Sequence, residues 1–519
     1  MLIKNKPYPW NERIPWIDSF AALLDFIEGE YPQKPAFIYE RGRQSHTVSF
    51  AEFVGDVRAL AAALSERDWA GKRYAILGES SYEWILYFFA GILAGAVAVP
   101  LDKELPAQEL QRRILQAEIE ITLYSQGCEF LAQGLDCAQK LPLEAELPRS
   151  DSPLPKQAPQ APAAVFFTSG TTGHPMAAVL SQKNLMLNVS AASRSFWEEG
   201  VNLLVLPLHH VYGLSAAVLA PMIGGSCSAI CPSVKYVKRF LSEYPPDCVF
   251  GVPMLVESVG AEIWRAAARQ GRTGQLKAML ALVNALQGLG LDFSKRLMAT
   301  VRKGFGGRLK TLVSGGGELS PRYYKLFRGL GVNLLNGYGI TECGPIVAIN
   351  RNFYHRDGSV GLPLCNTKVR IADDGEIQVR GESVFLGYYN DEEATKRAFT
   401  QDGWFKTGDI GRFDGDGFLY VTGRIKNLIV TTNGENVSPE ELENRLGEIE
   451  GVAEVLVYQQ ENEIVAEIYP EPGFADAQRK INAAVDELNR YLPLYSQIAR
   501  VKLRDTQFPR TTSMKIMRQ

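Results

Sequence analysis

The sequence predicts an α/β protein with a large N-terminal domain, made of two α/β subdomains plus a β-rich subdomain, and a small α+β C-terminal domain. Three features of the residue pattern support this. Apolar strand patterns alternate with helical patterns as far as Leu335, which is typical of parallel sheets covered by helices. Short strands separated by tight turns follow after residue 350. The pattern changes once more after Arg424, where roughly ninety residues mix helices and strands, enough for a small domain.

The first α/β subdomain is expected to alternate helices and short strands. Its expected elements are, in order, a helix over Trp16–Tyr31, strands over Pro35–Tyr39 and His46–Ser49, an amphipathic helix over Ala51–Ser65, a strand over Tyr74–Leu77, a helix over Tyr82–Leu93, a strand over Ala96–Pro100 and a helix from Gln108 to Gln116. A proline-rich stretch from Pro148 to Pro162 follows, and we expect it to be an exposed connector between two lobes.

The second α/β subdomain, the β-rich subdomain and the C-terminal domain follow in this order. The second subdomain is expected to contain the strands Leu203–Leu206, Cys227–Ile230, Cys248–Val252, Leu309–Ser314 and Val332–Leu335, with a helical insert over Val256–Arg269 and Gly274–Leu289. Tight turns separate the expected β-rich strands Lys368–Ala372, Glu376–Arg380 and Gly417–Thr422. The C-terminal domain is expected to contain Leu428–Thr431, Pro439–Leu446, Val452–Tyr458, Glu463–Tyr469 and Gln478–Leu492.

The composition shows no strong charge bias. The chain has 519 residues and a formal net charge of −3, from 55 basic and 58 acidic residues, so nothing suggests a nucleic-acid partner or bulk attraction to an anionic membrane. Its longest uncharged apolar run, Trp84–Val99, is too short to be a comfortable transmembrane segment and predicts a buried helix followed by a buried strand. The start of the chain lacks the apolar core of a secretory signal, and seven cysteines are scattered without paired spacing. We therefore expect reduced thiols in a cytoplasmic protein.

A loop rich in glycine and small hydroxyl side chains, Thr168–Gly173, follows the apolar run Ala163–Phe167. Glycine lets the backbone approach a ligand closely, and successive amides in such a turn form a concave site for anions. The loop is therefore a candidate phosphate cradle, although it lacks the Gly-Lys-Ser/Thr of the Walker type. Taken alone, the loop is explained equally well as a plain surface turn.

Three further segments carry residues suited to nucleotide chemistry. Asn336–Glu342 follows an expected buried strand, and ligands favour the carboxyl ends of parallel strands. Its tyrosine can stack on a base, its threonine can reach a phosphate and its glutamate can hold Mg²⁺. Asp409 and Arg424 can hold the hydroxyls of a ribose, and the last ten residues contain Lys515. Each segment alone could be an ordinary turn or a solvated charge.

Together, in their order and at their spacings, the four segments resemble the adenylate-forming superfamily of acyl-CoA synthetases, luciferases and stand-alone adenylation enzymes. The similarity covers essentially the whole chain, and further family-like segments are Leu206–Gly213, Gly315–Leu319, Gly381–Glu382, Gly387–Tyr388 and Asn433–Val437. The helical insert and the segment Phe305–Leu309 are most similar to the bacterial long-chain fatty acyl-CoA synthetases.

The resemblance implies an acid–thiol ligase that runs two half-reactions in one site. A carboxylate attacks the α-phosphorus of ATP in the presence of Mg²⁺, giving acyl-adenylate and pyrophosphate, and a thiol, usually that of CoA, then takes the acyl group and releases AMP. The resemblance also implies an ATP- and acyl-binding domain over residues 1–424, a hinge at 425–427 and a small mobile domain at 428–519. This small domain carries the catalytic lysine and rotates between the two steps.

The resemblance also assigns candidate roles to individual residues. The catalytic set is Lys515, Thr341, Glu342 and His210, with Glu342 also as the Mg²⁺ ligand. The ATP and AMP set is Thr168, Ser169, Gly170, Thr171, Thr172, Gly173, Gly315, Gly316, Gly317, Asn336, Gly337, Tyr338, Gly339, Asp409 and Arg424. The acyl pocket is expected to contain Val211, Tyr212, Gly251, Val252 and Pro253, the hinge Lys426, and the thiol-side loop Gly434. A small, apolar lining suits an aliphatic or aryl acid better than a charged one.

The phosphate loop departs from the family pattern. Its usual continuation is Pro-Lys-Gly, whereas this chain has Pro175-Met176-Ala177, so one phosphate-facing cation is missing. A charge-assisted contact of this kind is worth on the order of 1.5–3 kcal/mol, so the change would weaken ATP or pyrophosphate binding without abolishing the chemistry. His174 could supply a partial substitute.

These departures keep two other functions open. One is a non-enzymatic relative that binds ligands without turnover, which the intact residues Glu342, Asp409, Arg424 and Lys515 argue against. The other is an enzyme that loads the phosphopantetheine thiol of an acyl carrier protein. The chain has no obvious insertion that would block domain rotation, so CoA is the expected acceptor.

Overall fold

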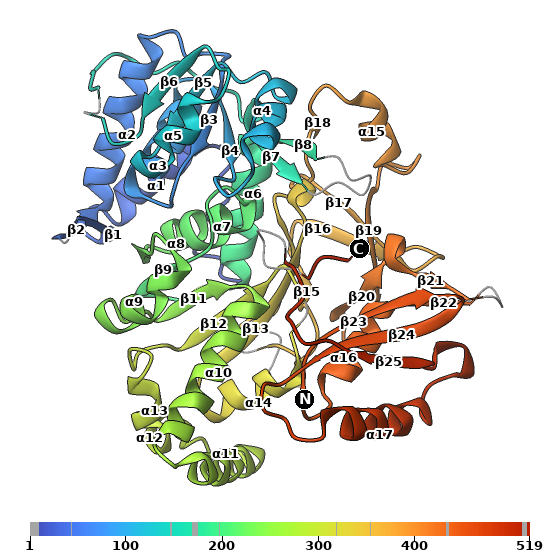
Figure 1. The fold of residues 1–519 in the computed structure, drawn as a ribbon. Helices are drawn as coiled ribbons and strands as arrows, with labels where there is room; N and C mark the ends of the chain where they lie inside the picture. Colours follow the sequence, from blue (N-terminus) through green and yellow to red (C-terminus); the bar gives the residue numbers. More distant parts are fainter. Residues whose placement is uncertain are drawn as a thin grey trace.

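Two large sheets organise the N-terminal part of the computed structural model (Figure 1), which describes residues 10–42, 44–145, 148–168, 175–196, 198–317, 319–352, 354–431, 435–510 and 516–518. Within these residues, the first sheet has seven strands, in the order β18 (Gly387–Tyr388), β8 (Met176–Ser181), β7 (Pro162–Thr168), β4 (Val97–Leu101), β3 (Arg73–Leu77), β5 (Ile121–Tyr124) and β6 (Gln139–Pro142). The strands from β3 to β7 run parallel, while β8 and β18 each run antiparallel to their neighbours.

The second sheet has nine strands within the same residues, in the order β15 (Leu362–Pro363), β14 (Ile346–Ile349), β13 (Asn333–Gly339), β12 (Thr311–Gly315), β11 (Cys248–Gly251), β9 (Val201–Leu204), β10 (Cys227–Ile230), β1 (Pro35–Arg41) and β2 (Gln44–Ser49). The sequence analysis placed the hairpin β1–β2 in the first subdomain. The structure corrects this, because the hairpin belongs to the nine-stranded sheet. The buried Phe37 of β1 pairs with Ser228 of β10, so a strand from near the start of the chain extends the sheet at the edge of β10.

Helices cover both sheets. They are α1 (Phe20–Glu30), α2 (Phe50–Ser65), α3 (Tyr82–Leu93), α4 (Ala107–Gln116), α5 (Glu129–Gln133), α6 (Gln182–Ser195), α7 (Val211–Leu214), α8 (Ala220–Ile223), α9 (Val237–Glu243), α10 (Pro253–Arg269), α11 (Thr273–Gly288), α12 (Ser294–Leu297), α13 (Ala299–Lys303), α14 (Pro321–Gly329) and α15 (Glu392–Arg397). Helix α3 is buried along its whole length, which confirms the buried helix predicted for the apolar run. None of the helices in the described ranges has the length and apolar character needed to cross a membrane.

The proline-rich stretch does not connect two lobes, contrary to the prediction. It joins β6 to β7, which are strands of the same seven-stranded sheet. The stretch also packs against α2: the Arg149 guanidinium lies 2.7 Å from the Asp56 carboxylate, and the Ser150 N–H donates to the Ala59 carbonyl. These two contacts hold the stretch against α2, within one lobe.

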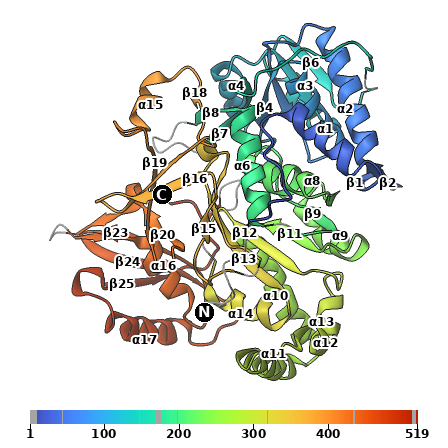
Figure 2. The same ribbon diagram turned by 180° about the vertical axis from the view of Figure 1, so that it is seen from behind.

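The β-rich subdomain is an antiparallel sheet in the order β16 (Thr367–Ile371), β17 (Glu376–Gly381), β19 (Phe405–Phe413) and β20 (Leu419–Arg424). The C-terminal domain follows with β21 (Ile429–Val430), β22 (Asn436–Val437), α16 (Pro439–Gly447), β23 (Val452–Gln460), β24 (Glu463–Pro470), α17 (Ala477–Asn489) and β25 (Arg500–Leu503). It has an apolar core of its own, which includes Leu446, Val457 and Ile481. Figures 1 and 2 show this domain in red beside the orange β-rich strands. The arrangement confirms the predicted fold class.

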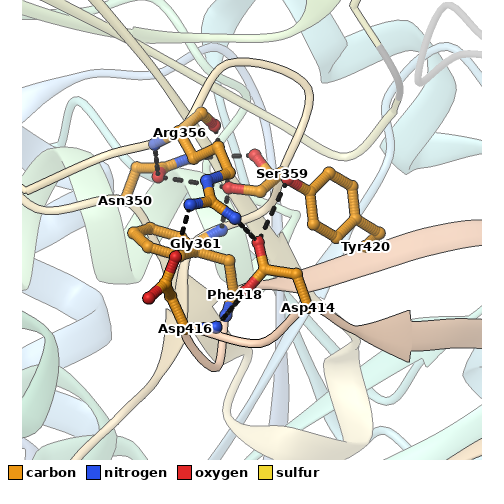
Figure 3. A network of polar contacts seen from close by, with 8 residues as sticks. All are labelled: Asn350, Arg356, Ser359, Gly361, Asp414, Asp416, Phe418 and Tyr420. Atoms are coloured by element: carbon orange, nitrogen blue, oxygen red, sulfur yellow. Dashed lines mark hydrogen bonds and ion pairs between the residues drawn. The ribbon is translucent and has the colours of Figure 1, made fainter. Parts of the chain in front are cut away.

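A charged network holds the β19–β20 turn against the loop between β14 and β15 of the second sheet (Figure 3). Arg356 forms ion pairs with Asp414 and, at 2.6 Å, with Asp416. Asp414 also accepts a hydrogen bond from the Phe418 N–H at 3.0 Å. Burial opposes the charge on Asp414, but the amide hydrogen bonds and Arg356 hold the pKa of this carboxyl below its usual value. The network thereby fixes the two strands that carry Asp409 and Arg424.

Replacing Asp414 with Asn is expected to destabilise the protein by about 1.5–3 kcal/mol at neutral pH, because a charged acceptor is lost while Arg356 keeps its charge. The folded-state pKa of Asp414 lies below its unfolded value. The stabilisation is therefore present above that unfolded value and is lost as the pH falls through the folded-state pKa. Urea unfolding of both proteins across this pH range measures the difference. Asp416→Asn is the matched control: this side chain is 51% exposed, and its loss should cost less than about 1 kcal/mol. Equal losses in the two variants would contradict the prediction.

Candidate functional site

A cavity of about 1830 Å³ runs through the N-terminal part of the chain as far as the hinge. Residues near the hinge, including Thr407, Arg424 and Lys426, line one end. The middle lies at the carboxyl ends of β12 and β13, and the far end lies between α9, α10 and α13. The cavity thus joins a polar region to an apolar region, and most of the predicted site residues lie along it.

The carboxyl ends of β12 and β13 form one wall of the cavity, in the position where parallel sheets generally bind ligands. At Gly315 a Cβ would lie 2.8 Å from the Tyr212 ring, so only glycine fits, and Gly316 has a φ of +79°. Strand β13 continues to Gly339, beyond the predicted end at Leu335, because β12 and β14 both pair with it there. The glycines of this wall that line the cavity are Gly315, Gly316, Gly337 and Gly339.

A buried carboxylate connects the tyrosine of β13 to the arginine of β20. The Tyr338 hydroxyl donates to Oδ2 of Asp409 at 2.7 Å, and Nε of Arg424 lies 2.9 Å from Oδ1. Asp409 is 3% exposed, and burial together with this carboxylate raises the pKa of Tyr338. Asp409 and Arg424 are cross-strand partners of β19 and β20, so the spacing of fifteen residues corresponds to one hairpin. Tyr338 and Arg424 line the cavity, and Asp409 fixes both.

Thr341 and Glu342 lie on the short 3₁₀ turn that follows β13, and both line the cavity. Glu342 is 6% exposed, and its Oε1 accepts a hydrogen bond from the Tyr388 hydroxyl at 2.8 Å. Burial raises the pKa of Glu342, while the hydrogen bond from Tyr388 and the charge of Arg424 oppose this rise. Among the described residues, no cluster of three acidic, histidine or cysteine side chains could hold a metal alone. A single buried carboxylate in a cavity fits Mg²⁺ that takes its other ligands from phosphate oxygens and water.

The two ends of the predicted phosphate loop also lie on the cavity. Thr168 of β7 and Met176 of β8 are cross-strand partners and both line it. Several predicted site residues lie outside the described residues: Ser169, Gly170, Thr171, Thr172, Gly173, Gly434 and Lys515, together with His174.

Two adjacent histidines lie between the phosphate-loop end and the apolar region, and both line the cavity. The rings of His209 and His210 are 4.3 Å apart, centroid to centroid, and Nε2 of His209 lies 3.6 Å from Oδ2 of Asp102. Burial, and next the neighbouring His210, lower the pKa of His209, so this ring is neutral at pH 7. His209 therefore meets Asp102 as an uncharged ring.

The predicted acyl-pocket residues mark the start of the apolar region. Val211, Tyr212 and Val252 line the cavity, and the Tyr212 hydroxyl donates to the Gly251 carbonyl at 3.3 Å. Five described residues of the predicted site lie outside the cavity lining: Asp409, Gly251, Pro253, Gly317 and Asn336. Asn336, for example, is 3% exposed and accepts the Gly337 N–H with its own Oδ1.

The sequence-based site missed one face of α10. The cavity continues along this helix, and the apolar residues there include Leu255, Val259, Ile263 and Ala266, spaced three or four apart, with the polar Ser258 and Glu262 beside them. This spacing puts them on one face of the helix. The periodicity was visible in the helical insert, but an apolar stripe that faces a cavity has the same pattern as one that faces a packed core.

The predicted hinge is a 3₁₀ turn over Ile425–Asn427 between β20 and the C-terminal domain. Lys426 lines the cavity, and burial, with Arg424 next, lowers the pKa of its ammonium. The Asn427 side-chain amide donates to Glu440 at the start of α16. The hinge turn is therefore in contact with both the cavity and the C-terminal domain.

Comparison with known proteins agrees with this geometry. A family model described as AMP-binding enzyme matches residues 27–389, and one described as AMP-binding enzyme C-terminal domain matches residues 426–519. A long-chain-fatty-acid–CoA ligase of Mycobacterium tuberculosis is 33% identical over 472 residues, which cover 83% of this chain and 78% of that protein. A 2-succinylbenzoate–CoA ligase of Listeria monocytogenes is 26% identical and covers 94% of this chain and 96% of its own length.

The fold comparison gives the same result. The structure of o-succinylbenzoate CoA synthetase from Bacillus subtilis, in complex with its acyl-adenylate intermediate, superimposes with a TM-score of 0.76 at 23% identity. It covers 95% of this chain and 96% of its own. The chain therefore belongs to the AMP-binding enzyme family, and its named relatives are acid–thiol ligases, as the four sequence segments predicted.

Proposed function

We propose that this chain uses ATP to convert a long apolar carboxylic acid into an acyl-adenylate and pyrophosphate, and then transfers the acyl group to CoA, releasing AMP. The observation that carries this proposal is the shape of the cavity: its polar end holds Glu342, Tyr338 and Arg424, and its other end follows an apolar face of α10. The relatives named above supply the acceptor, since both are CoA ligases.

At the polar end, the described residues suit an adenine nucleotide. The Tyr338 ring would stack on the base, and the Asp409–Arg424 pair would exchange its mutual contacts for those of the ribose hydroxyls. Thr341 would donate to the α-phosphate. Glu342 would hold Mg²⁺, which supplies positive charge to the phosphate oxygens when it is bound.

In the first step, an oxygen of the substrate carboxylate forms a bond to the α-phosphorus while the bond to pyrophosphate breaks. This brings two anions together, so positive charge must be placed beside both of them. Lys515 is proposed to bridge the carboxylate and the α-phosphate as a compact cation. In the second step, the CoA sulfur bonds to the acyl carbon and the bond to the AMP oxygen breaks. His210 would lie at the junction of the two regions, beside the reacting carboxyl group.

The acyl end suits a long aliphatic tail. Helix α10 has 17 residues, which at about 1.5 Å per residue is about 25 Å long. Its cavity face carries mainly apolar side chains as far as Ala267, and burial of each methylene there is worth about 0.8 kcal/mol. A fatty acid therefore fits the apolar end of the cavity better than a short or a charged acid.

The proposed domain division is residues 1–424, a hinge at 425–427 and a mobile domain at 428–519. The separate apolar core of the last part, which begins at Ile429, supports its motion as one unit. We propose that this motion withdraws Lys515 after adenylation and brings the loop at Gly434 toward the thiol.

Substituting Lys515 with Ala is expected to lower the rate of acyl-adenylate formation by at least about a hundredfold, because the cation between the two anions is lost. Thioester formation from supplied acyl-adenylate should change less than about threefold, since that step has no phosphoryl transfer. Pyrophosphate exchange measures the first step, and thioester release measures the second. Equal losses in both steps would contradict the alternation of the two domains.

Substituting Ala266 with Phe is expected to shorten the apolar end of the cavity. If the ring excludes three or four methylenes, kcat/KM for a sixteen-carbon acid should fall by roughly 50- to 200-fold, while short acids are little affected. Ala268→Phe is the matched control, because Ala268 is an exposed residue of α10 that does not line the described cavity. The proposal fails if the wild type exchanges pyrophosphate with charged acids, such as succinylbenzoate, better than with any fatty acid.

A further inference from the structure

Helix α4 lies against the base of the phosphate loop. The side-chain amide of Gln116, at the end of the helix, donates to the Pro175 carbonyl at 3.0 Å. One turn earlier, the Arg113 guanidinium lies over the Phe167 ring, 5.0 Å from its centroid. Phe167 directly precedes Thr168 in β7, and Pro175 directly precedes β8, so α4 contacts the chain on both sides of the loop.

Arg113 faces the cavity. Its side chain is 16% exposed, and it lines the cavity together with Phe167, Thr168 and Met176. Burial lowers the pKa of the guanidinium, but an arginine remains charged at every pH at which the protein folds. The base of the loop therefore has a partly buried, permanently charged cation on α4.

The Arg113 guanidinium has N–H donors that are available to a ligand. Two carboxylates interact with the guanidinium. Glu109, from the same helix, accepts a hydrogen bond from Nε at 3.4 Å, and the negative charge of Asp102 raises the pKa of Arg113. Among the described residues, neither terminal nitrogen of Arg113 has a hydrogen-bond partner. A guanidinium with two free nitrogens can bind two phosphate oxygens side by side.

The loop itself lacks a cation at its described end, because Met176 stands where the related pattern has lysine. We propose that Arg113 takes over this role: it binds the β- and γ-phosphate oxygens of ATP and stabilises the pyrophosphate that leaves. This inference rests on the proposed adenylation. In this chain the positive charge is then on α4, whereas position 176 of β8 holds an uncharged methionine.

The test compares Arg113→Gln with Arg112→Gln in the full-length protein. Arg112 is the next residue of α4 and pairs with the same Glu109, but its side chain is 73% exposed and it does not line the described cavity. Arg113→Gln is expected to weaken ATP binding by about 10- to 100-fold and to raise the KM for pyrophosphate in the exchange reaction by a similar factor. AMP binding should change less than about twofold, since AMP has no β- or γ-phosphate. Arg112→Gln should change neither.

A rescue experiment separates binding from a structural role. Adding Met176→Lys to Arg113→Gln is expected to recover at least tenfold of the lost ATP affinity, because a lysine on β8 restores a cation beside the loop. A parallel loss of ATP and AMP binding, or no recovery in the double variant, would overturn the inference and assign Arg113 to folding. If the wild type exchanges pyrophosphate but Arg113→Gln binds ATP and pyrophosphate as well as Arg112→Gln does, the inference about Arg113 is wrong while the proposed function stands. If the wild type exchanges none with any acid, the proposed function fails first.

Discussion

The buried carboxylate of Asp409 joins the three parts of the chain that make the site. One oxygen accepts the hydroxyl of Tyr338, which comes from the second large sheet, and the other meets Arg424, the last residue before the hinge. Asp409 itself belongs to the β-rich sheet. A buried charge of this kind is favourable only while it keeps its partners, so the three elements must stay in register. The pairing of β19 with β20 keeps Asp409 and Arg424 opposite each other, and the network around Arg356 holds the turn at the other end of this hairpin.

The cavity lies where these parts meet, and its two ends have different chemistry for that reason. The polar end is built from strand ends and the hinge, where backbone groups and charged side chains reach the surface of the sheets. The apolar end is built from the side of α10, which covers the second sheet with an apolar face. A substrate whose reactive group is charged and whose tail is apolar satisfies both ends at once. The junction near His210 is then the position of the reacting carboxyl group.

The sequence predicted the polar end far better than the apolar end. Glu342 and the Asp409–Arg424 pair are short segments fixed by strand and hairpin geometry, so their order along the chain carries the spatial information. The sequence placed the hairpin β1–β2 in the first subdomain, which was wrong, because a strand pattern does not specify which sheet edge the strand will join. The face of α10 could not be assigned to a cavity from the sequence. Amphipathic spacing predicts that a helix face is shielded from solvent, but it does not distinguish a packed core from a cavity.

Arg113 shows a further limit of linear patterns. A motif records which residue types stand at fixed offsets from a loop, whereas the phosphate oxygens require only that positive charge be near them in space. Helix α4 is about sixty residues before Met176, but Gln116 and Arg113 contact Pro175 and Phe167 on the two sides of the loop. A lysine on the loop and an arginine on the helix can therefore meet one electrostatic requirement from different positions in the sequence. The guanidinium is also held by the Phe167 ring, so less conformational freedom is lost when it binds phosphate than would be lost by a flexible lysine.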